Sequence, residues 1–209
     1  FYAPLHNPAN AMGIKTAQEL FSNVPHVAVF DTAFHHSMPD YAYTYGLPHE
    51  LCDRLGLRRY GFHGLSYQHI AAVLPRIDAR AAAGKTVVLH LGNGASLCAL
   101  AGGVSVASSM GFSALDGIPM ATRCGQIDPG VLLHLMAAHG MDSAALEELL
   151  YRRSGLLGIS GLSGDMRVLL ASDAPGARIA IAHFVHRIVR EVGALAATLG
   201  GLDALVFTG

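Results

Sequence analysis

TVVLHLGNGAS, residues 86–96, joins a compact apolar run directly to a glycine-rich turn. The run over residues 86–89 favours a buried strand, and the apolar segment 95–100 beyond the turn favours a second strand. Gly92 and Gly94 carry no Cβ, so the turn can adopt positive φ angles and can approach a ligand closely. The stretch therefore predicts two strands, over residues 86–91 and 95–100, with a glycine turn between them.

This turn has two interpretations. Asn-Gly is a preferred two-residue hairpin turn, so a plain hairpin accounts for Asn93 and Gly94. Successive backbone N–H groups in such a turn can also form a concave anion site, which suits a phosphate group. The string by itself leaves both interpretations open.

Other strands and helices are expected to alternate around this pair. Residues 26–30 favour a short strand that ends at Asp31, and residues 203–208 favour a buried strand. Helices are expected over residues 47–55, over 66–74 with an end before Pro75, from Asp128-Pro129 to Gly140, from Asp142 to near Gly155, and over 175–199. Strands that alternate with helices indicate an α/β layered fold.

Composition limits the possible classes of protein. The chain has 209 residues and is 52% hydrophobic, enough for one substantial domain or for one domain and part of another. Its 14 basic and 15 acidic residues nearly cancel, which argues against nucleic acid as the main partner. No apolar run approaches the roughly 20 residues that span a membrane. Three scattered cysteines fit free thiols in a reducing cytoplasm. Because the chain starts without methionine and stops just after a strand, we expect an internal piece of a longer protein.

Three polar side chains occupy positions that chemistry could use. Asp31 either caps the turn after its strand or directs a carboxylate at a ligand, since ligands of open α/β sheets bind at the carboxyl ends of strands. His63 lies in a loop between Gly61 and Gly64, which is a less ordinary place for an imidazole than a helix face. Arg123 is either a solvated charge or the holder of an oxyanion.

Two further sets of residues have competing interpretations. Asp165 begins a helix after a Gly/Ser loop, so Asp165 and Arg167 are either a helix N-cap pair or one edge of a nucleotide site. His183 and His186 could share a face of the long helix, but no third ligand of suitable type lies nearby in sequence. We therefore expect no metal site at these two histidines, and we assign no metal ligand in the chain.

Seven segments occur in the order in which acetate kinases carry them. The chain resembles the acetate/propionate kinase family along its whole length. The segments are APLHNP (3–8), VFDTAFH (29–35), RYGFHG (59–64), HLGNGAS (90–96), residues 109–129, residues 154–167 and residues 206–209.

The resemblance implies a fold and an activity. The fold would be the duplicated ribonuclease-H-like α/β fold of the acetate and sugar kinase, actin and chaperone-ATPase superfamily, incomplete here. Residues 1–35 would complete a first domain, and residues 36–209 would form most of a second, nucleotide-binding and dimerising domain. The activity would be reversible phosphorylation of acetate by ATP with Mg²⁺, in a cytoplasmic homodimer. Alternatives are a propionate or butyrate kinase, or a non-catalytic nucleotide-binding remnant.

The resemblance also implies roles for individual residues. Asp31, His63 and Arg123 would be catalytic, and His6 and Asn7 would contact the substrate. The nucleotide would be bound by His90, Leu91, Gly92, Asn93, Gly94, Asp165, Met166 and Arg167. The family usually has other residues where this chain has Tyr67, Ala107 and Ala121.

Asp31 is expected to orient its neighbours rather than to remove a proton. A carboxylic acid substrate has a pKa of about 4 to 5, so at pH 7 it is already an ionised nucleophile. A general base would have nothing to remove. Asp31 would instead orient Arg123, His63 or a metal-bound water.

Overall fold

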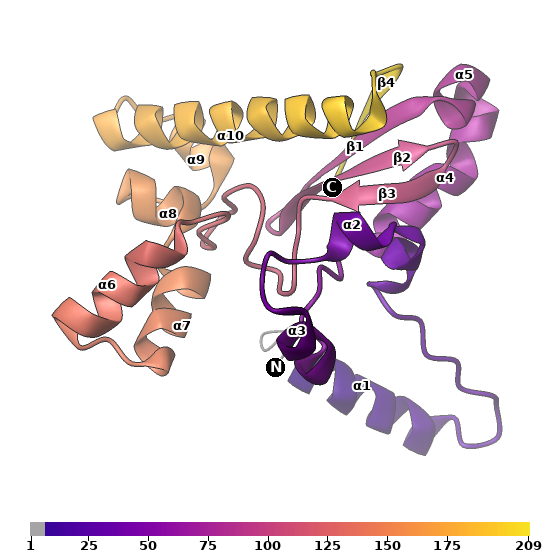
Figure 1. Cartoon of the computed structure of the whole chain (residues 1–209), viewed down its shortest axis with the longest axis horizontal. Helices are drawn as coiled ribbons and strands as arrows, with labels where there is room; N and C mark the ends of the chain where they lie inside the picture. The colour runs from indigo at the N-terminus through magenta and orange to yellow at the C-terminus, as the bar shows by residue number, and fades with distance from the viewer. Residues whose placement is uncertain (1–6) are drawn as a thin grey trace.

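The structure is a computed structural model, and it describes residues 7–209. A mixed four-stranded sheet with the order β3-β2-β1-β4 forms its centre (Figure 1). Its strands are β1 (Lys85–Leu91), β2 (Ala95–Ala101), β3 (Val104–Ser108) and β4 (Ala204–Thr208). β1 and β2 pair antiparallel, as do β2 and β3, whereas β4 runs parallel to β1. The expected α/β class and the expected hairpin are both confirmed.

Helices surround the sheet and extend away from it. They are α1 (Asn7–Leu20), the 3-10 helix η1 (Ala33–Ser37), α2 (Asp40–Tyr43), α3 (His49–Leu55), α4 (Gly64–Ile77), α5 (Ala79–Ala83), α6 (Pro129–His139), α7 (Ser143–Arg152), α8 (Gly155–Ser160), α9 (Met166–Leu170) and α10 (Pro175–Leu199). The helix starts expected at Asp128, Asp142 and Asp165 are confirmed, since each aspartate accepts a hydrogen bond from a main-chain N–H in the first turn.

The two faces of the sheet bury different side chains because strand residues alternate in direction. Val87, Leu89 and Leu97 belong to the core beneath α10. Val88 and Leu100 belong to a second core on the α4 side. The hairpin is thus buried on both faces, which explains its nearly continuous apolar sequence.

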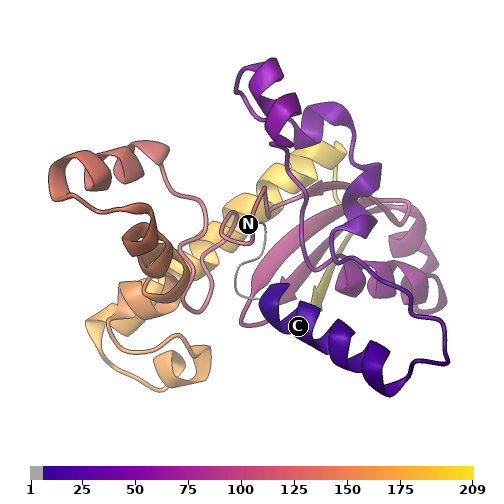
Figure 2. The same ribbon diagram turned by 90° about the horizontal axis from the view of Figure 1, so that it is seen from below.

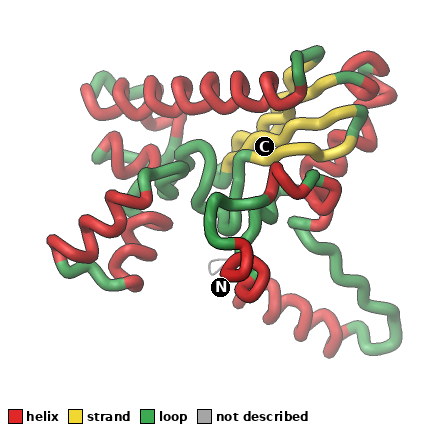
Figure 3. Tube along the Cα trace, in the orientation of Figure 1, coloured by secondary structure: helices red, strands yellow, loops and turns green. Residues whose placement is uncertain are grey.

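The long helix α10 joins the sheet to a separate group of helices. One end of α10 lies over the sheet, and the other end lies against α8 and α9 (Figures 1 and 2). Ala177 and Ala180 pack there with Leu156 and Leu169. The long loop between β3 and α6 lies between these two parts of the molecule (Figure 3).

Three expectations about the elements were wrong. Residues 26–30 form an extended, exposed loop, because no described strand lies beside them to complete a ladder. Helix α4 continues past Pro75 to Ile77: the proline removes only the one hydrogen bond that its own N–H would donate to the carbonyl of Ala71, and the helix ends two residues later. β4 is only half buried, with Phe207 66% exposed, because α10 packs on β2 and β1 rather than on β4.

Within residues 7–209, no helix has both the length and the apolar character needed to cross a bilayer.

Candidate active site

The glycine turn is a hairpin whose glycines provide space rather than unusual backbone angles. Residues 92–94 join β1 to β2, and neither Gly92 nor Gly94 has a positive φ. A Cβ added at Gly94 would lie 2.5 Å from Arg123 Nη2 and 3.1 Å from His63 Nε2. Two of the three expected catalytic side chains therefore converge on this turn, although 60 residues separate them in sequence.

Asp31 holds the main chain at His63. Its Oδ2 accepts a hydrogen bond from His63 N at 2.7 Å, and its Oδ1 accepts a longer one from Leu65 N at 3.4 Å. Asp31 thus caps the N-terminus of α4 across 32 residues instead of capping the turn that follows it. Its carboxylate contacts the backbone at His63, not the imidazole.

His63 adopts a backbone conformation that few side chains tolerate. It is the only non-glycine residue with positive φ in the described chain, at φ 56° and ψ 24°. Such left-handed conformations are uncommon outside glycine and are kept where the surrounding structure enforces them. Here the hydrogen bond to Asp31 holds the main chain of His63, and the imidazole points at the turn.

The His63 ring is stacked and partly desolvated. It lies 4.3 Å from the His90 ring, centroid to centroid, at an interplanar angle of 20°. Its Nδ1 lies 2.8 Å from Ser96 Oγ, and His90 Nδ1 lies 3.0 Å from Ser66 Oγ. Burial, with His90 and Arg123 as further causes, lowers the pKa of His63 to about 4. The imidazole is consequently neutral at pH 7.

Arg123 is anchored at one nitrogen and available at the other. Its Nη1 donates to the carbonyl oxygen of Ala114 at 2.8 Å, and Nη2 lies beside Gly94. Burial lowers the pKa of Arg123, but an arginine remains protonated in proteins. A guanidinium held in this way can bind an anionic oxygen at the turn without first losing side-chain freedom.

A buried histidine supports the loop that carries His63. His35 Nε2 donates to the carbonyl oxygen of Phe62 at 3.0 Å, and His35 Nδ1 lies 2.9 Å from Ser105 Oγ. His35 is fully buried, and this burial lowers its pKa, so the ring is neutral. Sequence reasoning missed this residue because its partners lie 27 and 70 positions away.

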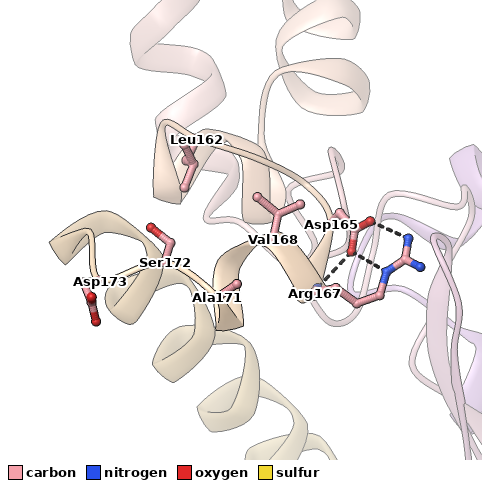
Figure 4. A pocket seen from close by; sticks show the side chains of 7 residues that line it. All are labelled: Leu162, Asp165, Arg167, Val168, Ala171, Ser172 and Asp173. Carbon is pink, nitrogen blue, oxygen red and sulfur yellow. Dashed lines mark hydrogen bonds and ion pairs between the residues drawn. The ribbon is translucent and has the colours of Figure 1, made fainter.

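Asp165, Met166 and Arg167 lie in a different part of the structure. Arg167 Nη2 pairs with Asp165 Oδ2 at 2.6 Å, and this pairing lowers the pKa of Asp165 to about 2. The two residues border a wide, open depression of about 900 Å³ (Figure 4). Met166 packs into the core beside α10. Both interpretations of the pair persist, because Asp165 is the N-cap of α9 and also borders this depression.

The expected substrate residues are not joined to the site by any described contact. Asn7 is the exposed first residue of α1, a helix that buries no side chain. His6 lies outside the described residues. Among residues 7–209, no group of three or more histidine, cysteine or acidic side chains is arranged to hold a metal ion.

The fold and this site together define a class of protein. A mixed sheet that gathers a guanidinium, two imidazoles and a glycine turn at one strand end can hold an anionic group. The chain belongs to the Acetokinase family, whose model matches residues 1–209. The resemblance drawn from the seven segments is confirmed.

Individual relatives agree with the family assignment. The chain is 56% identical over 208 residues to an acetate kinase of Rhodopseudomonas palustris and 57% identical over 207 residues to one of Methylocella silvestris. Each alignment covers 99% of this chain, but only 52% and 51% of the respective relative. The chain therefore spans about half the length of these relatives.

Solved structures match over a similar extent. A crystal structure of Porphyromonas gingivalis acetate kinase has a TM-score of 0.91 and 41% identity, and the match covers 99% of this chain and 53% of that one. A crystal structure of a Francisella tularensis propionate kinase has a TM-score of 0.93 and 41% identity, with 99% and 54% covered.

Proposed function

We propose that the protein containing this chain transfers a phosphoryl group between ATP and acetate. The observation that carries the proposal is the convergence of Arg123 Nη2 and His63 Nε2 at Gly94. Phosphoryl transfer depends on positioning and on stabilising charge over the phosphoryl oxygens. A cationic guanidinium and a neutral imidazole on one side of the turn suit those oxygens. From its resemblance to the acetate kinase family, we expect the whole protein to be a cytoplasmic homodimer.

The chain's own residues have distinct roles in this proposal. Arg123 and His63 contact oxygens of the migrating phosphoryl group. The turn at residues 92–94 binds phosphate, while the nucleotide contacts Asp165 and Arg167 beside the open depression. Asp31 holds the main chain of His63 in place. The acceptor carboxylate is already ionised at neutral pH, so it attacks without a general base.

Asp31 also fits a Mg²⁺ ion bound together with ATP. Mg²⁺ bound with nucleotide phosphates usually keeps several waters and takes only one or two protein carboxylates. Each oxygen of Asp31 accepts one main-chain hydrogen bond, which leaves lone pairs for a further ligand. When bound, Mg²⁺ would neutralise charge on the phosphates.

A hydroxamate-trapping assay on the whole protein tests this function. Acyl phosphate formed from ATP, Mg²⁺ and each of acetate, propionate and butyrate is converted to a coloured hydroxamate. We expect the highest kcat/KM with acetate. The match to a propionate kinase makes propionate the second candidate. ATP binding without turnover on any of the three acids would contradict a kinase and would support a non-catalytic nucleotide-binding protein.

Asp31→Asn is expected to lower kcat about tenfold, because a charged acceptor stabilises a hydrogen bond by roughly 1 to 2 kcal/mol more than a neutral one. The amide oxygen can still accept from His63 N, so the fold should be kept. Steady-state kinetics across Mg²⁺ concentrations measure the effect, with exposed Asp53→Asn as the matched control. Unchanged kcat and Mg²⁺ dependence would show that Asp31 has no such role.

The depressed pKa of His63 predicts a loss of stability in acid. The unfolded chain protonates this histidine below its ordinary pKa of 6.5, but the folded protein does so only near 4. The contribution of neutral His63 to the free energy of unfolding is therefore complete above pH 6.5 and declines as the pH falls toward 4. The loss at pH 5 is about 2 kcal/mol. Urea unfolding at pH 7 and pH 5 should show a smaller acid loss for His63→Gln than for the wild type. His69→Gln, at an exposed position on α4, should behave like the wild type. Equal losses in all three proteins would contradict the prediction.

A further inference from the structure

Behind His63 lies a short chain of hydroxyl groups. Ser96 Oγ is 2.8 Å from His63 Nδ1 and 2.5 Å from the phenol oxygen of Tyr67. Tyr67 and Ser96 are both completely buried. Burial also raises the pKa of Tyr67 well above its ordinary value, so the phenol keeps its proton. Ser96 therefore joins the Tyr67 phenol to the partly buried His63 ring at a point that bulk water does not reach.

The direction of these hydrogen bonds is set at Tyr67. The phenol has a single proton, and Ser96 Oγ is the acceptor that the structure places next to it. Because Tyr67 donates to Ser96, the hydroxyl proton of Ser96 can point at His63 Nδ1. His63 Nδ1 then accepts this hydrogen bond and carries no proton of its own.

The opposite direction would leave a buried donor without a partner. If His63 Nδ1 carried its proton, the protons on His63 Nδ1, Ser96 Oγ and the Tyr67 phenol would have only the two contacts at Ser96 to share. One of the two buried hydroxyl protons, on Ser96 or on Tyr67, would then have no acceptor among the hydrogen bonds of the described residues. An unsatisfied buried donor is disfavoured because it has lost its hydrogen bond to water.

We propose that Tyr67 and Ser96 are positioning residues that hold His63 as the tautomer with its proton on Nε2. This nitrogen is the one beside Gly94, so the turn meets a hydrogen-bond donor rather than a lone pair. A lone pair there would repel the oxygens of a phosphoryl group, whereas an N–H can donate to them. The catalytic consequence rests on the proposed function, but the tautomer itself does not.

The test is the ¹⁵N spectrum of the histidines in the whole, ligand-free protein at pH 7. Long-range ¹H–¹⁵N correlations distinguish a protonated ring nitrogen from an unprotonated one, and the signals of His63 are those that vanish in His63→Gln. We expect Nε2 to be protonated and Nδ1 to be unprotonated. A proton on Nδ1 in the wild type would overturn the proposal without the need for any other variant.

Two variants test the chain of hydroxyls. Ser96→Ala should populate the second tautomer and lower kcat roughly twofold to tenfold, the effect of losing one hydrogen bond, with KM for ATP unchanged. Tyr67→Phe should act in the same direction but more weakly, because Ser96 keeps its hydroxyl. Tyr41→Phe, at a tyrosine that is 81% exposed, is the matched control and should change neither the tautomer ratio nor kcat.

The outcomes separate this proposal from the proposed function. An unchanged tautomer ratio in folded Ser96→Ala would overturn the positioning role even if the protein were an active kinase. A fixed Nε2–H tautomer that Ser96→Ala releases would support the role even if no acid were phosphorylated.

Discussion

Arg123→Ala in the whole protein is expected to lower kcat by about 10² to 10³-fold, or roughly 2.7 to 4 kcal/mol of transition-state stabilisation. The guanidinium is anchored through Nη1 on Ala114 and keeps Nη2 beside Gly94, where we place the phosphoryl oxygens. Alanine removes the charge and both contacts. Steady-state kinetics in the direction of acyl phosphate formation measure the loss.

Whether Arg123→Ala changes kcat or KM shows which role the guanidinium has. A group that acts in the transition state lowers kcat, whereas one that only binds substrate raises KM. Arg123→Lys should restore little, because a lysine lacks the rigid fork that lets one nitrogen hold Ala114 while the other faces the turn. Arg54→Ala, on the exposed side of α3, is the control. A higher KM with unchanged kcat would contradict our assignment of Arg123.

Gly64→Ala is expected to destabilise the protein by about 1 to 3 kcal/mol, the usual cost of forcing an extra group into a filled space. A Cβ at Gly64 would overlap the carbonyl oxygen of Asp31 and lie 3.1 Å from Phe34 Cβ. Gly64 N also donates to that carbonyl oxygen at 2.9 Å. The methyl group would therefore push Asp31 away from the start of α4, and kcat should fall together with stability.

Gly13→Ala is the matched control for this substitution. Gly13 lies in α1, and no atom comes within 4 Å of a Cβ added there. Alanine is about 1 kcal/mol more favourable than glycine inside a helix, so this variant should be neutral or stabilising. Urea unfolding of both variants gives the comparison. A stable, fully active Gly64→Ala protein would show that the contact between Asp31 and α4 is not needed.

Features that depend on neighbours in sequence were predicted well. The capping aspartates Asp128, Asp142 and Asp165 begin their helices because each side chain reaches N–H groups two or three residues ahead. The hairpin followed from two apolar runs and a short turn. By contrast, residues 26–30 have the composition of a strand, but a strand also needs a partner, which local composition does not provide.

The candidate site also contains some residues that local sequence identifies and others that only distant contacts identify. Asp31, His63 and Arg123 stood out because their loops are rich in small residues and resemble those of a known family. The residues that hold these three side chains in place did not stand out, because serine, tyrosine and a buried histidine are ordinary residues in a strand or a helix. Ser96 and His35 became identifiable only through partners 33 and 70 positions away.

The sequence by itself determined the family and the hairpin, and it singled out the three side chains that we propose for phosphoryl transfer, because motifs and local backbone preferences act over a few residues. Only the tertiary structure decided how these groups meet. It placed Asp31 on the main chain of His63 and put Arg123 beside Gly94. It also desolvated the His63 ring against His90 and Ser96. The charge and hydrogen-bonding state of a side chain depend on what surrounds it in space, and packing between distant segments creates those surroundings.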